Sequence, residues 1–295
     1  MNHSMNEVKS YIVNKEEVYN DYESWEDMYL SKDHIHINSC IYSDVDSHSI
    51  HLYKDMIIFL ELQEKEWKRK LCGSFSYDLS LDPLGVTVKN GDRFSFVLRS
   101  DQLGFSACNR KKRRIYDFYI DNMGKSPESH EKVCKWIYEA RSIGGCFLWP
   151  IEMKNGEWDT NPQYNKTRGT GFFQDRADLT LLDIKNCFTK EDGSWLLKQY
   201  NSRPNMKKWL DHFGTGMEGF QTYADFFCFE STFLEEYRAK DLQDGELINS
   251  INDDKYKRKF SDYSPEELER VLSNTNEWIK KRSKIMEGII NREFS

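Results

Sequence analysis

The spacing of apolar residues changes partway along the chain, and this change most constrains the fold. Between about residues 70 and 120 apolar and polar residues alternate, as in the runs at 73–77, 86–88 and 93–98. Such alternation is typical of strands with one buried face. From residue 175 onward apolar residues recur at spacings of three and four, which indicates helices. The sequence therefore predicts an α+β protein, with an antiparallel sheet in its middle third and a mostly helical second half packed on it.

Local signals place the boundaries of several elements. Asn90-Gly91 predicts a hairpin between two strands, because this pair suits a tight turn. Ser126-Pro127 and Ser264-Pro265 each predict a helix start, because serine caps a helix and proline fits its first position. We expect helices at 50–67, from 126, at 176–188, 194–200, 204–213 and 217–236, and from 265, with a buried strand at 146–149 and a turn at 154–157.

Composition indicates a folded chain. Charged residues make up 31% and mean hydropathy is -0.77, yet 14% of residues are aromatic, far too many for a disordered chain. We expect a single domain over 1–295, with 1–40 as a candidate peripheral N-terminal segment. The seven cysteines form no CxxC pair, which favours reduced thiols and a cytoplasmic location. No apolar stretch approaches membrane-spanning length, so we expect no membrane partner.

A net charge of -7 disfavours nucleic acid as a partner, because non-specific binding depends on neutralising phosphates with lysine and arginine. One dense basic run, at 109–114, leads into alternating aromatic residues and could still hold a nucleic-acid backbone. The alternative is a solvated loop, which is the usual place for such a run.

The most distinctive string lies at 165–181. An Arg-Gly-Thr-Gly turn runs into the start of a helix, whose first turn offers free backbone N–H groups to an anion such as phosphate. The predicted ligand-binding residues are Arg168, Gly169, Arg176 and Thr180, and the predicted catalytic residues, acting as general base or metal ligand, are Asp175 and Asp178. In the alternative, purely structural interpretation, Arg176 only pairs with one of these aspartates.

A second polar segment lies upstream. Asp44 and Asp46 are followed by His48 and His51 and preceded by His34-Ile35-His36. Carboxylates and imidazoles at this density could bind a divalent metal, which would be the cofactor. The alternative is a turn or a cap, because Asp and Ser also bond to their own backbone.

Several strings together resemble a known family. They are Asp44-x-Asp46-Ser47-x-Ser49, Ile143-Gly144-Gly145, Asn165-x-x-Arg168-Gly169 and Asp175-Arg176-x-Asp178-Leu179-Thr180-Leu181. They resemble a family of uncharacterised bacterial proteins known only as a domain of unknown function, of which Asp-Arg-x-Asp-Leu-Thr is the most specific part. Val45, Met56 and Leu182 depart from its pattern. The resemblance implies a bacterial cytosolic protein that forms one unit, with no activity to carry over.

Three functions stay open at this point. The first is binding of, or action on, a phosphate-bearing ligand such as a nucleotide, held by the helix that starts near Asp175. The second is a non-catalytic protein–protein interaction, in phage defence or a toxin–antitoxin system. The third is a metal-dependent hydrolase, in which Asp44 or Asp46 would meet Asp175 and Asp178 in space.

Overall fold

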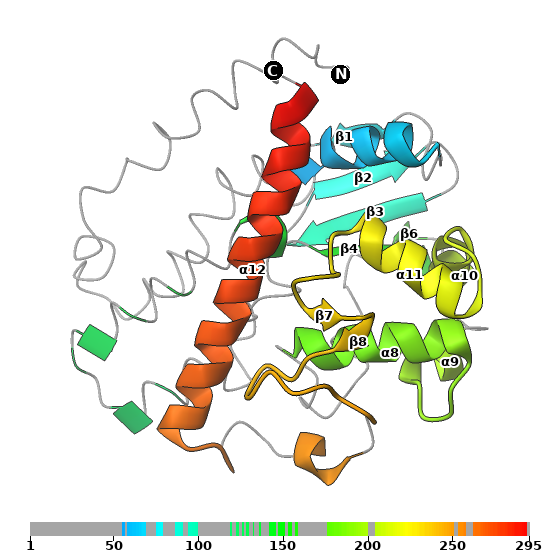
Figure 1. The fold of residues 1–295 in the computed structure, drawn as a ribbon. Helices are drawn as coiled ribbons and strands as arrows, with labels where there is room; N and C mark the ends of the chain where they lie inside the picture. Colours follow the sequence, from blue (N-terminus) through cyan, green and yellow to red (C-terminus); the bar gives the residue numbers. More distant parts are fainter. Residues whose placement is uncertain are drawn as a thin grey trace.

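The structure is a computed structural model of the chain. It describes residues 55–56, 58–68, 75–78, 86–90, 94–99, 147–150, 153–154, 157–158, 176–199, 204–250, 253–257 and 262–293, with isolated positions between 119 and 145. These residues form a small antiparallel sheet and a set of helices, one of them long (Figure 1). The predicted α+β class, with a helical second half, is confirmed.

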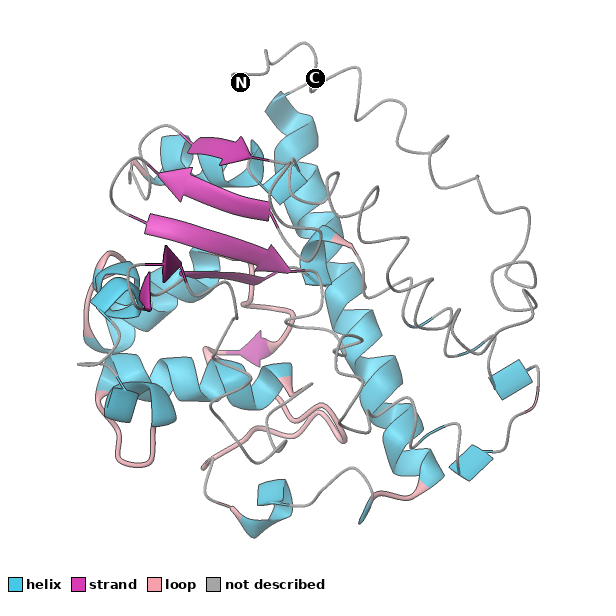
Figure 2. Cartoon of the chain, turned by 180° about the vertical axis from the view of Figure 1, so that it is seen from behind, coloured by secondary structure: helices cyan, strands magenta, loops and turns pink. Residues whose placement is uncertain are grey.

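The main sheet is four-stranded and antiparallel throughout, as Figure 2 shows. Its strands, in spatial order, are β1 (Phe75–Asp78), β2 (Val86–Asn90), β3 (Phe94–Arg99) and β4 (Phe147–Pro150). Asn90 pairs with Phe94, so the chain reverses where Asn90-Gly91 predicted a hairpin. The buried strand predicted at 146–149 joins this sheet as β4, at the edge beside β3.

Two short hairpins lie outside the main sheet. In the first, β5 (Met153–Lys154) pairs with β6 (Glu157–Trp158), which confirms the turn predicted at 154–157. In the second, β7 (Leu234–Glu235) pairs with β8 (Arg238–Ala239). Strand β7 falls inside the helix predicted at 217–236, which is wrong there, whereas β8 lies beyond the predicted end of that helix.

Helices make up most of the second half. The α-helices are α8 (Ala177–Thr189), α9 (Trp195–Gln199), α10 (Pro204–Asp211), α11 (Gly216–Phe226) and α12 (Pro265–Glu293), with 3-10 turns η1 (Ile143–Gly145) and η3 (Asp254–Lys257). Residues 55–56 and 58–67 are also helical, as predicted. In Figure 1, α12 runs along one side of the described elements, past both the sheet and α8.

The helix predicted at 217–236 ends ten residues early, at Phe226. Cys228 takes a left-handed φ of 56°, and the amide of Phe229 donates to the carbonyl of Ala224 at 2.8 Å, which closes the last turn. Phe226 to Phe229 are all buried. An apolar run with no polar face carries no periodicity, so it could not show where the helix stops.

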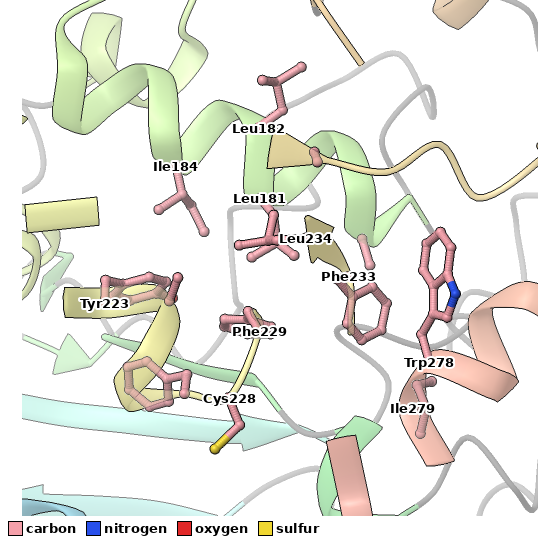
Figure 3. Packing of buried hydrophobic residues seen from close by; sticks show 14 of the residues in the cluster. Leu181, Leu182, Ile184, Tyr223, Cys228, Phe229, Phe233, Leu234, Trp278 and Ile279 are labelled. Atoms are coloured by element: carbon pink, nitrogen blue, oxygen red, sulfur yellow. The ribbon is translucent and has the colours of Figure 1, made fainter. Parts of the chain in front are cut away.

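The core forms where aromatic rings of α11, and of the segments that follow α10 and α11, meet α8. The Tyr223 ring lies 5.1 Å from Phe213 and 5.0 Å from Phe227, centroid to centroid. Leu181 and Ile184 of α8 are fully buried and point toward the layer that holds Tyr223 and Phe229 (Figure 3). Free thiols at positions 187 and 228 are buried in the same region, as reduced core cysteines should be.

Arg282 of α12 is wholly buried and ties three elements together. Its Nε donates to the carbonyl of Phe227 at 2.8 Å, and its Nη1 to the carbonyl of Gly144 at 2.7 Å. The guanidinium also lies 4.4 Å from the centroid of the Phe229 ring. A cation therefore satisfies the backbone carbonyls that the ends of α11 and η1 leave open.

Gly144 lets η1 and α12 touch backbone to backbone. Its amide donates to Ser283 Oγ at 2.9 Å. A Cβ at this position would lie 2.3 Å from the carbonyl oxygen of Ile279 and 2.5 Å from the Ser283 nitrogen. Only glycine fits there, which gives a packing reason for the Ile-Gly-Gly string.

Candidate functional site

The predicted anion site begins at the residue that precedes α8. Arg176 occupies the N-cap position, and its side chain makes no capping hydrogen bond. Thr180 donates to the Arg176 carbonyl twice, from its amide at 3.1 Å and from its Oγ1 at 3.0 Å. Thr180 is 4% exposed, so its hydroxyl reinforces the first helical turn.

The Arg176 side chain is buried in an ion pair with Asp178. Nε lies 2.9 Å from Asp178 Oδ1 and Nη2 lies 2.6 Å from Oδ2, a two-pronged pairing that suits a guanidinium and a carboxylate. Nη1 donates to the hydroxyl of Tyr263 at 3.0 Å. The exposed fraction is 3% for the Arg176 side chain and 0% for that of Asp178. The pairing named as the structural alternative is therefore present.

The Asp178 carboxylate also accepts hydrogen bonds from two backbone amides. Its Oδ1 accepts from the amide of Leu179 at 2.8 Å, and its Oδ2 from the amide of Leu242 at 3.0 Å. Leu242 is distant in sequence and fully buried. One carboxylate thus fixes both the start of α8 and a loop from another part of the chain.

That loop, residues 241–246, brings further charges to Arg176. Asp241 is 1% exposed; its Oδ1 lies 3.6 Å from Arg176 Nη2 and accepts from the amide of Gln243 at 2.7 Å. Its Oδ2 lies 2.9 Å from Lys255 Nζ, an ion pair without hydrogen-bond alignment. Lys255 also donates to Asp244 Oδ2 at 3.0 Å.

The loop is fastened to α12 on its other side. Asn274 donates to the carbonyl of Leu242 at 2.8 Å, and Gln243 donates to Glu267 Oε1 at 2.9 Å. Ser264 and Glu267 form a capping box at the predicted helix start: the Ser264 amide donates to Glu267 Oε2 at 2.8 Å, and the Glu267 amide donates to Ser264 Oγ at 3.3 Å. The loop is therefore held between α8 and the first half of α12.

We call Arg176, Asp178, Asp241, Asp244, Lys255 and Tyr263 the Arg176 cluster. Its two cations face three carboxylates, a net charge of -1. Burial by itself lowers the pKa of Arg176, but the charge and hydrogen bonds of Asp178, with Tyr263 and Asp241, outweigh it and raise that pKa. A phosphate at the guanidinium would have to displace Asp178 and would meet a surplus of negative charge.

The structure does not describe the remaining predicted site residues. Arg168, Gly169, Asp175, Asp44 and Asp46 lie outside the described residues, and so does the basic run at 109–114. Their predicted roles, and the catalytic role of Asp178, stay predictions. Among the residues that the structure describes, no three His, Cys, Asp or Glu side chains are grouped so that they could hold a metal ion.

Sequence reasoning missed Asp241, Lys255 and Tyr263, because no local pattern connects them with Arg176. A local signal was present: aspartates at 241 and 244 followed by glycine suggest a tight turn, and Gly245 has a φ of 77°. That signal predicts the turn alone. Contact with Arg176 depends on long-range packing.

A second polar arrangement lies at the hairpin β7–β8. Its two turn residues, Glu236 and Tyr237, both have positive φ, at 48° and 57°. Each turn amide donates to one carboxylate oxygen of Glu230 at 3.0 Å, and the Tyr237 hydroxyl donates to Asp225 Oδ2 at 3.0 Å. Turns of this kind favour Asn and Gly, and a larger residue costs about 1–2 kcal/mol in the left-handed conformation. Two carboxylates therefore hold a strained turn in place.

The strain of this turn is measurable. Replacing Glu236 with asparagine should stabilise the protein by about 0.5–1 kcal/mol, because asparagine tolerates the left-handed conformation and the amide bond to Glu230 is kept. Urea denaturation measures the change. Glu235→Asn, an equally exposed position in the adjoining strand, should bring no gain. A loss of stability in Glu236→Asn would contradict the account of the turn.

The fold and its buried cluster define an α+β protein with a four-stranded antiparallel sheet, braced by ion pairs at the start of α8. The chain belongs to a family of unknown function, DUF6994, whose pattern matches residues 26–286. The resemblance to a domain of unknown function is thus confirmed. A search of curated proteins and a search of solved structures each found no match. No helix in the described part is long and apolar enough to span a membrane.

Proposed function

We propose that this protein is a non-catalytic interaction protein whose partner binds at the hairpin β7–β8. The strained turn of that hairpin is the observation that carries the proposal. Residues held in sparsely populated backbone conformations persist only when their surroundings enforce them, and they gather at functional sites. Here the enforcing groups are Glu230 and Asp225, and the turn they hold is at the surface.

The chemistry of this surface indicates the kind of partner. We define the hairpin surface as Asp225, Glu230, Glu235, Glu236 and Tyr237. Four of its members are acids, and the tyrosine between them is partly exposed. Burial raises the pKa of Tyr237, with Asp225 adding to the shift, so its hydroxyl remains a donor. The hydrogen bond from that hydroxyl to Asp225 orients the ring. A fixed aromatic ring with an acidic rim suits a partner that presents lysine or arginine.

The phosphate-ligand prediction has less support in the described residues. Its central residue, Arg176, is engaged with Asp178 and Tyr263 at a cluster of net negative charge. Its other residues, Arg168 and Gly169, lie outside the described part. A setting in phage defence or a toxin–antitoxin pair stays part of the proposal, and the metal-dependent hydrolase stays a prediction.

Charge reversal tests the proposal. The double variant Glu235→Lys/Glu236→Lys is compared with Asp192→Lys/Glu218→Lys, which makes the same charge change at exposed positions elsewhere. Proteins that bind to both the wild type and the control variant are identified and purified. The affinity of each one for the wild type and for both variants is then measured by calorimetric titration. We expect the hairpin variant to bind the partner at least about tenfold more weakly, as the loss of close charge pairs implies. Equal binding by the two variants would contradict the proposal.

A further inference from the structure

Lys240 directly follows β8, and its backbone is paired on both sides. Its amide donates to the carbonyl of Phe233 at 3.1 Å, and the residue forms an antiparallel bridge with Leu247. The amide of Ile248 donates to the carbonyl of Ala239 at 2.8 Å and continues this pairing. The side chain of Lys240 therefore starts from a backbone position that two neighbouring segments hold in place.

The side chain of Lys240 packs on an aromatic ring of α12. Lys240 Nζ lies 5.0 Å from the centroid of the Trp278 ring. Trp278 is 6% exposed, and its ring packs edge-on against Phe233 with 5.6 Å between centroids, which fixes its position (Figure 3). Lys240 itself is partly exposed. Its amine is thus held against a buried ring and is still open to solvent on one side.

A second lysine acts on the same amine. Lys281 lies one turn of α12 beyond the aromatic ring, and Glu277 holds its ammonium group at 2.6 Å. Burial lowers the pKa of Lys240 and Lys281 lowers it further, against the opposing charges of Glu235, Glu230 and Glu277. A lysine that is desolvated and lies near another cation is more often a neutral amine, and the neutral amine is a nucleophile.

We propose that Lys240 is a nucleophilic amine that binds small, uncharged aldehydes covalently as an imine. The amine adds to the carbonyl carbon, a proton moves from nitrogen to oxygen, and the adduct loses water to leave a carbon–nitrogen double bond. One aldehyde and one amine thus give one imine and one water, with no oxidant or reductant. Three carboxylates and one other ammonium group act on this amine, which disfavours an anionic aldehyde. The inference does not depend on a partner at the hairpin surface.

Reductive trapping tests the proposal. The full chain is treated near neutral pH with limiting propanal and cyanoborohydride, which reduces an imine to a stable secondary amine. Peptide mass spectrometry then gives the rate of labelling at each lysine. We expect Lys240 to be labelled at least about fivefold faster than Lys208, an exposed lysine of α10. Equal rates at these two lysines would overturn the proposal.

A matched pair of variants separates activation of the amine from simple exposure. Lys281→Gln removes the neighbouring cation and should slow the labelling of Lys240 by about twofold or more, because it raises the pKa of that amine. Lys284→Gln makes the same charge change one turn further along α12 and should leave the rate unchanged. Both positions are exposed, so both variants should fold. If Lys240 is labelled as fast in Lys281→Gln as in the wild type, its surroundings do not activate it and the proposal is wrong.

Discussion

Replacing Asp178 with alanine is expected to destabilise the protein by about 3–5 kcal/mol, because the buried guanidinium of Arg176 loses its paired carboxylate. Arg176 is 3% exposed, so water cannot take the place of that carboxylate. The amide of Leu242 also loses its acceptor, which frees the loop 241–246 from α8. Alanine is the best helix former, so the position in α8 does not itself disfavour the variant.

Urea denaturation at neutral pH measures this effect as a change in midpoint at constant slope. Asp178→Asn is the matched control for shape: it keeps an oxygen acceptor but loses the charge, and should fall between wild type and alanine. Asp192→Ala, at an exposed position, should change stability by less than about 0.5 kcal/mol. If Asp178→Ala costs less than about 1 kcal/mol, Arg176 has another compensating partner, and the account of the cluster is wrong.

The second large effect is expected at Gly144. Alanine there should destabilise the protein by about 3 kcal/mol, because overpacking between two rigid backbones forces them apart. The Cβ would lie within 2.5 Å of Ser283 backbone and closer still to the Ile279 carbonyl. Separation of η1 from α12 would also weaken the bond from Arg282 to the Gly144 carbonyl.

Thermal and urea unfolding of Gly144→Ala both report this effect. Gly288→Ala is the natural comparison, since the same substitution in a glycine of α12 itself meets open space and should act in the opposite direction. A Gly144→Ala protein as stable as the wild type would mean that η1 and α12 do not pack as closely as the structure shows.

The sheet could be predicted because its signal is local. Alternation fixed the strands around Val88 and Phe96, and Asn90-Gly91 fixed where they reverse. The start of α8 could be predicted from sequence in the same way, and so could the pairing of Arg176 with an aspartate two residues away. Each of these features depends on residues that are neighbours in sequence.

The rest of the cluster could not be predicted for the opposite reason. Asp241 and Tyr263 reach Arg176 only after the chain has folded, and nothing local distinguishes them from other surface-type residues. The end of α11 was missed because Phe226 to Phe229 are apolar on every side. The hairpin turn at Glu236 and Tyr237 was missed because its sequence is atypical of a turn with two positive φ angles.

A double-mutant cycle on Arg176 and Asp178 tests most directly whether the Arg176 guanidinium serves the fold. The free energy of unfolding is measured in urea for the wild type, Arg176→Met, Asp178→Ala and the double variant. We predict that the double variant loses at least about 2 kcal/mol less than the sum of the two single losses, because each substitution removes the same buried pair. Losses that add to within about 0.5 kcal/mol would show two independent residues and contradict a structural role for the pair.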